Sequence, residues 1–239
     1  MRSHLHLGRI PYLTDFLSLF FPNLCLICQY RSSLTQHNFC LSCQQRLPYT
    51  NFHEVKENLF TDRFWGRIPL QTGAALFFLH KNGLVQELIY RLKYNDRPKI
   101  GIQLGRLYGN ILKNHSVFAT ADYIVPVPLH PTRKRKRGYN QSTQFAIGLS
   151  EAMKIPYEER ILKRIIATTT QTHKSRLERF ENVLAAFVVN DPTLAQNKHI
   201  LLVDDVLTTG ATMEACATRL LEVKGVKISM ATIASTTTN

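Results

Sequence analysis

The sequence predicts an α/β fold, in which a mostly parallel sheet carries helices on both faces. From residue 70 onward, β-branched and apolar runs alternate with segments of helical periodicity. Residues 199–203 form a nearly continuous apolar run, which is expected of a strand buried on both faces of a parallel sheet. A small-residue turn and an amphipathic helix follow this run. Strands that alternate with helices in this way are typical of a sheet with helices on both sides.

The predicted elements start at residue 70 and follow a strand and helix order. Leu84, Leu88 and Leu92 recur at helical spacing, and Gly225 stands where a helix C-cap belongs. In order, the elements are a strand at 74–78, helices at 84–94 and 102–112, a strand at 122–128, a helix at 142–153, a strand at 199–203, a helix from 212 and a last strand from 226.

Length and composition set the scale of the molecule. The 239 residues, with 44% hydrophobic and 20% charged side chains, suffice for one α/β core and a small appended module. Thirty Lys and Arg against 17 Asp and Glu give a net charge of +13. Such an excess favours polyanionic partners, for example nucleic acid or phosphorylated ligands. A generally basic surface without a specific partner is the alternative.

Four of the five cysteines form two CxxC pairs near the N-terminus, at Cys25, Cys28, Cys40 and Cys43. Each pair presents two thiolates to one ion, so two pairs can complete a tetrahedral, structural zinc site. A redox-active CxxC pair is the alternative, but the thioredoxin-like context is missing. His37 could also replace one ligand. Cys216 stands alone and is most simply a buried helix residue.

The chain is predicted to have three parts. Residues 1–48 hold a short amphipathic helix at 12–21 and the cysteine module, residues 49–69 are a polar, irregular linker, and residues 70–239 are the α/β domain. The apolar stretch 16–21 is far shorter than the roughly 18 to 20 residues that a membrane span needs. Together with the sparse cysteines of the larger domain, this predicts a cytoplasmic protein without membrane insertion.

The segment 200–212 carries the clearest chemistry. A buried strand leads into two adjacent carboxylates, Asp204 and Asp205, which could accept hydrogen bonds from vicinal sugar hydroxyls. The turn after them opens a helix, so its backbone N–H groups and hydroxyls form an anion site. A threonine-capped turn with merely solvated acids is the alternative. The residues of this turn are Thr208, Thr209, Gly210, Ala211 and Thr212.

Two further segments favour phosphate chemistry. Residues 125–141 contain a proline-rich strand exit and five consecutive basic residues, 133–137, which suit a pyrophosphate or a nucleic-acid backbone. Residues 164–182 are polar and threonine-rich, and are predicted to be a mobile loop that leads into a helix at Ser175 and closes over a reacting sugar. Exposed loops without a function are the alternative in both cases.

Segment 200–212 closely resembles the PRPP signature of type I phosphoribosyltransferases. The run Arg137-Gly-Tyr-Asn-Gln141, the cysteine module and Lys93-Tyr94 resemble the ComF/GntX, competence-associated subfamily. The resemblance implies a type I phosphoribosyltransferase-like domain, in which the acid pair binds the ribose hydroxyls of PRPP and the turn binds its 5′-phosphate, with magnesium held mainly by PRPP. It also implies a pyrophosphate loop of Val127, Pro128, Leu129, His130, Arg133 and Arg137, and a flexible loop with Gln171, Arg176, Arg179 and Asn182.

Two functions are compatible with this resemblance. ComF-like relatives are linked to natural transformation, which implies a PRPP-binding protein that works with DNA-uptake proteins and contacts single-stranded DNA. The alternative is an orphan transferase that moves ribose 5-phosphate from PRPP to an amine or a nucleobase. No residue stands out as a general base. Tyr30 and Phe39 are the few aromatics between the cysteines, which limits base stacking on that module.

Overall fold

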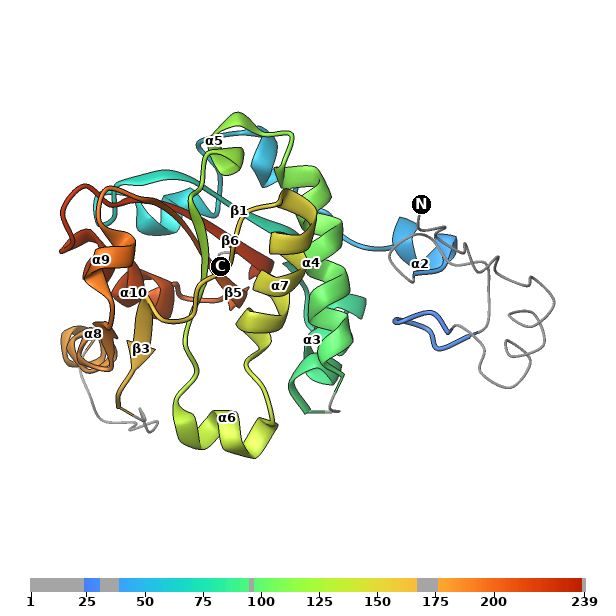
Figure 1. Ribbon diagram of the computed structural model, residues 1–239. Helices are drawn as coiled ribbons and strands as arrows, with labels where there is room; N and C mark the ends of the chain where they lie inside the picture. The colour runs from blue at the N-terminus through green and yellow to red at the C-terminus, as the bar shows by residue number, and fades with distance from the viewer. Residues whose placement is uncertain (1–23, 31–38, 95–96, 167–175, 238–239) are drawn as a thin grey trace, which may run out of the picture. The chain divides into compact units, whose positions relative to one another are not determined.

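The computed structural model describes residues 24–30, 39–94, 97–166 and 176–237 (Figure 1). The chain forms two compact units, residues 1–46 and 47–239. The helix predicted at 12–21 and the alternative ligand His37 lie outside the described residues. Among the helices described here, none has the length and apolar character that a membrane crossing requires.

A four-stranded parallel sheet forms the centre of the larger unit. Its order is β1 (Leu70–Leu79), β6 (Lys227–Thr236), β5 (His199–Leu207) and β2 (Tyr123–Pro126). The four strands run in one direction, so their carboxyl ends meet at one edge, where open α/β sheets bind ligands. This confirms the predicted parallel sheet.

Strand β5 extends further than predicted. It continues through the acid pair to Leu207, because Asp204 lies opposite Thr232 of β6 and Val206 lies opposite Ala234. The two carboxylates therefore emerge from a paired strand and not from a loop, which fixes the backbone that carries them.

Helices cover both faces of the sheet, as predicted (Figure 1). Helices α3, α4 and α7 lie on one side, and α8, α9 and α10 lie on the other, together with a two-stranded antiparallel sheet of β3 and β4. The bounds of these elements and of the two further helices α5 and α6 are α3 Leu84–Tyr94, α4 Pro98–Leu112, α5 Ser116–Ala119, α6 Pro131–Arg137, α7 Gln141–Met153, β3 Leu162–Arg164, α8 Arg176–Ala185, β4 Phe187–Val189, α9 Pro192–Ala195 and α10 Ala211–Leu221.

Glycines bring α4 and α7 into close contact. A Cβ atom at Gly105 would lie 2.8 Å from the Cα of Gly148, and one at Gly148 would overlap the carbonyl oxygen of Ile102. Side chains at these positions would push the helices apart. The contact sets the position of α7, whose first turn carries Ser142 to the edge of the sheet.

Residues 49–69 do not form the predicted linker. They contain two short 3-10 helices, η1 (Phe52–Glu54) and η2 (Thr61–Phe64), within the larger unit. Phe60 and Phe64 are fully buried, and Asn58 Nδ2 donates a 3.0 Å hydrogen bond to the carbonyl oxygen of Gly73 in β1. Burial of two phenylalanines stabilises a segment whose composition alone resembles a loop.

The basic run at 133–137 is helical, where a loop was predicted. It belongs to α6, which begins with Pro131 in its first turn and is capped by His130, whose side chain accepts a hydrogen bond from the Thr132 amide. Gly138, at φ +81°, ends the helix. Lys and Arg are good helix formers, so the run itself supports this conformation.

The α4–α7 contact generates a stability prediction. We expect Gly148→Ala to lower the free energy of unfolding by about 1–3 kcal/mol, because the added methyl group overlaps backbone atoms of α4. Urea unfolding followed by circular dichroism measures this change. Ser150→Ala in the same helix is the control and should have little effect. Without the overlap, Ala would stabilise the helix relative to Gly, so a gain in stability would refute the contact.

Candidate functional site

The acid pair is held by contacts from three elements at the carboxyl edge. Ser142 Oγ, on α7, donates a 2.7 Å hydrogen bond to Asp204 Oδ1, and the amide of Asp205 donates a 2.8 Å bond to the same oxygen. Lys93 Nζ, on α3, lies 2.9 Å from Asp205 Oδ2. One carboxylate thus faces hydrogen-bond donors, and the other forms an ion pair.

The electrostatic cost of this arrangement falls on Asp204. Removal of its carboxylate from water, together with the neighbouring charge of Asp205, raises the pKa of Asp204 from 3.8 to about 7. The hydrogen bonds from Ser142 and the Asp205 amide, and the charge of Lys93, oppose the rise without cancelling it. A ligand that donates hydrogen bonds to these oxygens would favour the ionised form.

The small-residue turn joins β5 to α10 as the sequence predicts. Gly210 adopts φ +84°, a conformation that favours glycine, and caps the N-terminus of α10. Thr208 and Thr209 are exposed, while Gly210 is buried. Thr209 Oγ1 accepts a 3.5 Å hydrogen bond from the amide of Ala211. The turn therefore presents hydroxyls and the N-terminal amides of an eleven-residue helix to solvent.

Arg63, in η2, is a residue of this site that sequence reasoning missed. Its guanidinium donates to the carbonyl oxygens of Thr208 in the turn and of Thr236 at the end of β6. A Cβ atom at Gly210 would lie 3.2 Å from Phe64, so the same segment packs behind the turn. The buried aromatics four residues apart, at 60 and 64, were the available signal that this segment is folded.

Arg67 forms a second link between this segment and α10. Its Nη1 lies 2.5 Å from Oε2 of Glu214, whose side chain is largely buried. Glu214 lies one turn into α10. The Arg67–Glu214 ion pair therefore joins the segment after η2 to the helix that follows the turn 208–212.

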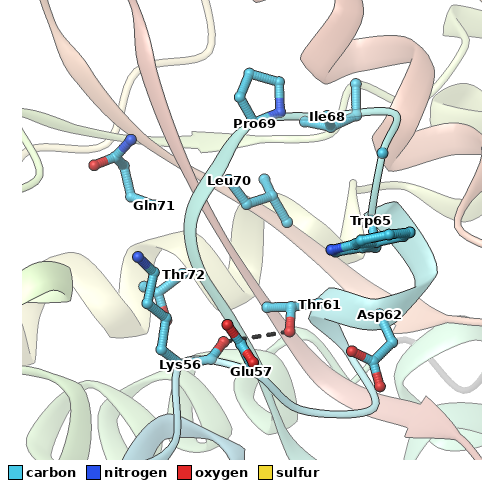
Figure 2. A pocket seen from close by; sticks show the side chains of 11 residues that line it. Lys56, Glu57, Thr61, Asp62, Trp65, Ile68, Pro69, Leu70, Gln71 and Thr72 are labelled. Carbon is cyan, nitrogen blue, oxygen red and sulfur yellow. Dashed lines mark hydrogen bonds between the residues drawn. The ribbon is translucent and has the colours of Figure 1, made fainter.

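A pocket of about 500 Å³ lies along the same segment (Figure 2). Trp65, which is 86% exposed, lines one side of the pocket. The lining also contains the charged residues Asp62, Glu57 and Lys56. None of the residues predicted to bind a ligand lines this pocket.

The predicted pyrophosphate-loop residues follow β2 at the same edge. Val127 is buried, and its carbonyl oxygen accepts a 3.0 Å hydrogen bond from Asn140 Nδ2. His130 caps α6, and Arg133 is exposed on that helix. Arg137 Nη1 donates a 2.9 Å bond to Gln141 Oε1. Pro128 and Leu129, the remaining two, are partly exposed between β2 and α6.

The predicted flexible loop is only partly described. Gln171 and Ser175 lie outside the described residues. Arg176 and Arg179 belong to α8, where the positions of their side chains are not described, and Asn182 is exposed on the same helix.

Arg164, in β3, is a further cation near the acid pair that the sequence did not single out. Burial lowers the pKa of Arg164, and the positive charge of Arg133 adds to this effect, whereas the charge of Asp204 opposes it. Its guanidinium carbon lies 5.1 Å from the centroid of the Phe187 ring. Arg164 therefore lies within the electrostatic reach of both Asp204 and Arg133.

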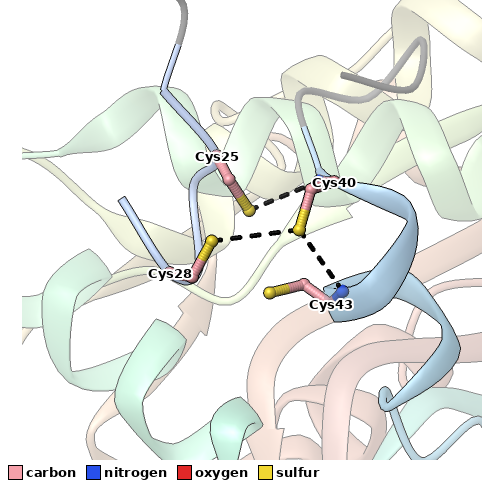
Figure 3. Close-up of side chains that lie close together, drawn as sticks. All are labelled: Cys25, Cys28, Cys40 and Cys43. Carbon is pink, nitrogen blue, oxygen red and sulfur yellow. Dashed lines mark hydrogen bonds between the residues drawn. The ribbon is translucent and has the colours of Figure 1, made fainter. Parts of the chain in front are cut away.

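The four-cysteine cluster lies in the smaller unit, and Figure 3 shows its sulfurs pointing toward one another. All ligand atoms lie within 4.8 Å of each other, and no disulfide joins them. The Sγ atoms of Cys28 and Cys40 are 3.8 Å apart, close to the roughly 3.8 Å that tetrahedral geometry with 2.3 Å metal–sulfur bonds requires. The cluster could therefore hold a metal ion.

Backbone amides also prepare this cluster for a cation. Burial opposes ionisation of Cys25, but the amides of Cys40, Cys28 and Ile27 outweigh it and lower the pKa of Cys25 to about 7. Burial and hydrogen bonds among the thiols raise the pKa of Cys43 to about 12. The amide of Cys43 points at the Sγ of Cys40 at 3.4 Å, at the start of α2 (Leu41–Gln45).

Comparison with known proteins gives one family and several relatives. The model of the phosphoribosyl transferase domain matches residues 111–238. The DNA utilization protein YhgH of Salmonella typhi is 34% identical over 137 residues, which cover 56% of this chain and 60% of that protein. Competence protein F of Haemophilus influenzae is 34% identical and covers 59% of this chain and 62% of its own length. The chain thus spans about 60% of the length of these relatives.

A third relative and two solved structures have shorter or weaker matches. Competence protein ComFC of Streptococcus pneumoniae is 38% identical, with 43% of each chain covered. A glutamine PRPP amidotransferase from B. subtilis, complexed with ADP and GMP, has a TM-score of 0.40 at 23% identity and covers 59% of this chain and 30% of its own. An adenine phosphoribosyltransferase from Leishmania tarentolae has a TM-score of 0.39 at 11% identity, with 66% and 90% covered.

The raised pKa of Asp204 predicts a stability effect with a definite sign. Between about pH 4 and 7 the folded chain keeps a proton that the unfolded chain releases, so stability falls as the pH rises through this window. Asp204→Asn removes the charge but keeps an acceptor for Ser142. We expect it to raise the free energy of unfolding by about 2 kcal/mol or more at pH 8 and by little at pH 4.

Urea unfolding across this pH range measures the effect. Asp122→Asn is the matched control, because the amide of His199 holds the pKa of Asp122 below its ordinary value. That variant should instead lose stability at high pH and approach the parent protein as the pH falls. A gain from Asp204→Asn that does not change with pH would contradict the assignment.

Proposed function

Because the chain belongs to the phosphoribosyl transferase domain family, whose model matches residues 111–238, we propose that it binds PRPP at the carboxyl edge of its sheet. The observation that carries the proposal is the order of groups at this edge: Asp204 and Asp205 lie near the carboxyl end of a buried strand, and the turn 208–212 that follows this strand opens a helix. Carboxylates beside a helix N-terminus suit a ligand with sugar hydroxyls on one side and a phosphate on the other.

In this proposal each part of PRPP has its own partners. The hydroxyls of the ribose donate to the acid pair, and the turn binds the 5′-phosphate. Magnesium, which prefers substrate phosphates to an all-protein cage, is held mainly by the pyrophosphate and ribose oxygens. Arg133 and Arg137, on the predicted pyrophosphate loop, supply the positive charge that the leaving group needs. The flexible loop, with Gln171, Arg176, Arg179 and Asn182, covers the sugar.

The acid pair gives Lys93 a defined role. Its ammonium lies 2.9 Å from Asp205 Oδ2 and offsets the negative charge. A ribose hydroxyl that donates to Asp205 would share this oxygen. We therefore assign Lys93 to positioning and neutralisation of the acid pair, not to proton transfer, and we assign no general base.

Zinc is the metal we propose for the four-cysteine cluster. Four thiolates favour zinc over hard cations, and a set of four protein ligands leaves no open position for catalysis, so the site is structural. No disulfide joins the described cysteines, which fits the reducing environment of the cytoplasm, where we propose that the protein acts.

We further propose that the protein acts in DNA uptake and natural transformation together with DNA-uptake proteins, and that it contacts single-stranded DNA. Two relatives are named competence proteins and another a DNA utilization protein. The net charge of +13 also favours a polyanionic partner. Transfer of ribose 5-phosphate to an amine or a nucleobase is the second candidate function, supported by the family match and by the cations near the acid pair.

PRPP binding is tested by calorimetry. We expect the parent protein to bind PRPP only with magnesium, and Asp205→Asn to weaken binding at least about tenfold, because one charged acceptor for the ribose hydroxyls is lost. Asp62→Asn, which neutralises an exposed carboxylate in η2 next to Arg63, is the control. The proposal would be overturned if the parent protein did not bind PRPP, or if Asp62→Asn weakened PRPP binding as much as Asp205→Asn does. Pyrophosphate release with a panel of bases and amines then separates binding from catalysis.

The metal is tested by elemental analysis of the purified chain. We expect about one zinc ion per chain in the parent protein, and loss of that ion in Cys28→Ser, because a tetrahedral site with three thiolates holds zinc less tightly. Cys216→Ala, at a buried cysteine outside the cluster, should keep the zinc. Iron in place of zinc, or equal metal content in both variants, would refute this assignment.

A further inference from the structure

Helices α3 and α6 border a groove with a strongly one-sided charge. The groove has a volume of about 720 Å³. Among the described residues that line it are five cationic side chains and no carboxylate. The residues that line it are Lys93, Tyr94, Arg133, Arg135, Lys136, Arg137 and Gly138. Figure 1 shows α6 and the end of α3 at the same end of the larger unit.

Two tyrosines extend this groove along α3. Tyr90 and Tyr94 lie four residues apart, so they share one face of the helix. Their ring centroids are 5.0 Å apart, and the two residues are 54% and 62% exposed. The guanidinium carbon of Arg137 lies 5.4 Å from the centroid of the Tyr94 ring. Arg137, Tyr94 and Tyr90 therefore form a continuous row that runs from the groove along α3, with the two rings inclined at 44° to each other.

Contacts with the rest of the domain hold this row in place. Tyr139 donates a 2.5 Å hydrogen bond from its hydroxyl to the carbonyl oxygen of Leu92, which ties the chain after α6 to the last turn of α3. Arg137 is oriented by its bond to Gln141 on α7. The groove is thus built from two elements that are fastened to each other, and the exposed rings do not depend on a loose loop.

We infer that this groove, here called the α3–α6 groove, binds single-stranded nucleic acid, with bases stacked on the tyrosine row and phosphates against the cations of α6. Pyrophosphate alone would need the cations but would leave two exposed aromatic rings without a role. Unpaired bases offer π-faces to tyrosine, and a basic groove follows the phosphate backbone. Duplex bases are already stacked on each other, so the rings favour the single strand.

The zinc module is the less suitable surface among the described residues. Phe39 is fully buried there, and Tyr30 is the only described aromatic of the module with an exposed ring. The α3–α6 groove has five described cations and the exposed ring of Tyr94 in its lining, and the exposed ring of Tyr90 lies next to Tyr94. It also adjoins the proposed PRPP site, because Lys93 lines the groove and pairs with Asp205. The inference rests on the proposed function, in that it locates the surface for the DNA contact proposed above.

Fluorescence anisotropy with a labelled oligo-dT strand and the full-length, zinc-loaded chain tests the stacking. We expect Tyr90→Ala/Tyr94→Ala to weaken binding at least about tenfold, because stacking of bases on the rings is lost. Tyr90→Phe/Tyr94→Phe should retain the affinity of the parent. Tyr157→Ala, at an exposed tyrosine away from the groove, is the matched control. Unchanged binding by the alanine pair, or equal affinity for duplex and single strand, would overturn the inference.

A second comparison separates the groove from the overall charge. Arg135→Ala/Lys136→Ala and Lys113→Ala/Lys224→Ala each remove two positive charges, but only the first pair lies in the groove. We expect the first pair to reduce the slope of log affinity against log salt by about 0.7 for each lost phosphate contact, and the second pair to leave it unchanged. Equal effects would assign binding to net charge alone and refute the groove.

The same samples distinguish failure of this inference from failure of the proposed function. Calorimetry with PRPP and magnesium is run on the parent and on Tyr90→Ala/Tyr94→Ala. A parent that binds PRPP but not the oligonucleotide refutes the groove and leaves the PRPP proposal standing. A parent that binds the oligonucleotide through the tyrosines but ignores PRPP refutes the PRPP proposal alone. Thermal unfolding of each variant confirms that the fold is retained.

Discussion

The site depends on one electrostatic constraint: two adjacent carboxylates must coexist at the end of a buried strand. Pairing of β5 with β6 fixes the backbone that carries both acids. Ser142 and Lys93 approach from two different helices and neutralise or satisfy one carboxylate each. The close α4–α7 contact matters for the same reason, because it sets where Ser142 stands. A ligand that brings hydroxyls and a cation to this edge would stabilise the negative charge of the two carboxylates, which the protein's own contacts offset only in part.

Local patterns predicted the parts of the fold that depend on neighbours in sequence. The buried strand, the acid pair, the glycine of the turn and the following helix lie within one short segment, and the structure confirms their order. The recognition of a ComF/GntX-type phosphoribosyltransferase is also supported, by the family match and by relatives named competence proteins. The helical conformation of 131–137 was missed because prolines and a basic run resemble an exposed loop, although His130 and Pro131 are suitable helix starters.

Contacts between distant residues could not be predicted in this way. Nothing near Arg63 indicates that it reaches a carbonyl oxygen 145 residues later, and its polar neighbours suggested a linker. The α3–α6 groove has the same origin. Tyr94 and Arg137 are 43 positions apart in the printed sequence, and only the fold brings the ring and the guanidinium together. Side chains that complete a site from outside its motif are the usual limit of sequence reasoning.

The guanidinium of Arg63 fastens the turn after β5 and the end of β6, at separations of 145 and 173 residues. Contacts between residues so far apart in sequence close long loops, and closing a long loop costs conformational entropy. Such contacts are therefore expected to form late, once other contacts have brought the segments together. We therefore expect the bonds from Arg63 to the turn to form late as the domain folds. A fragment cut at the limits of the family match, 111–238, would keep the acid pair, the turn and the basic run and still lack the arginine that contacts the turn.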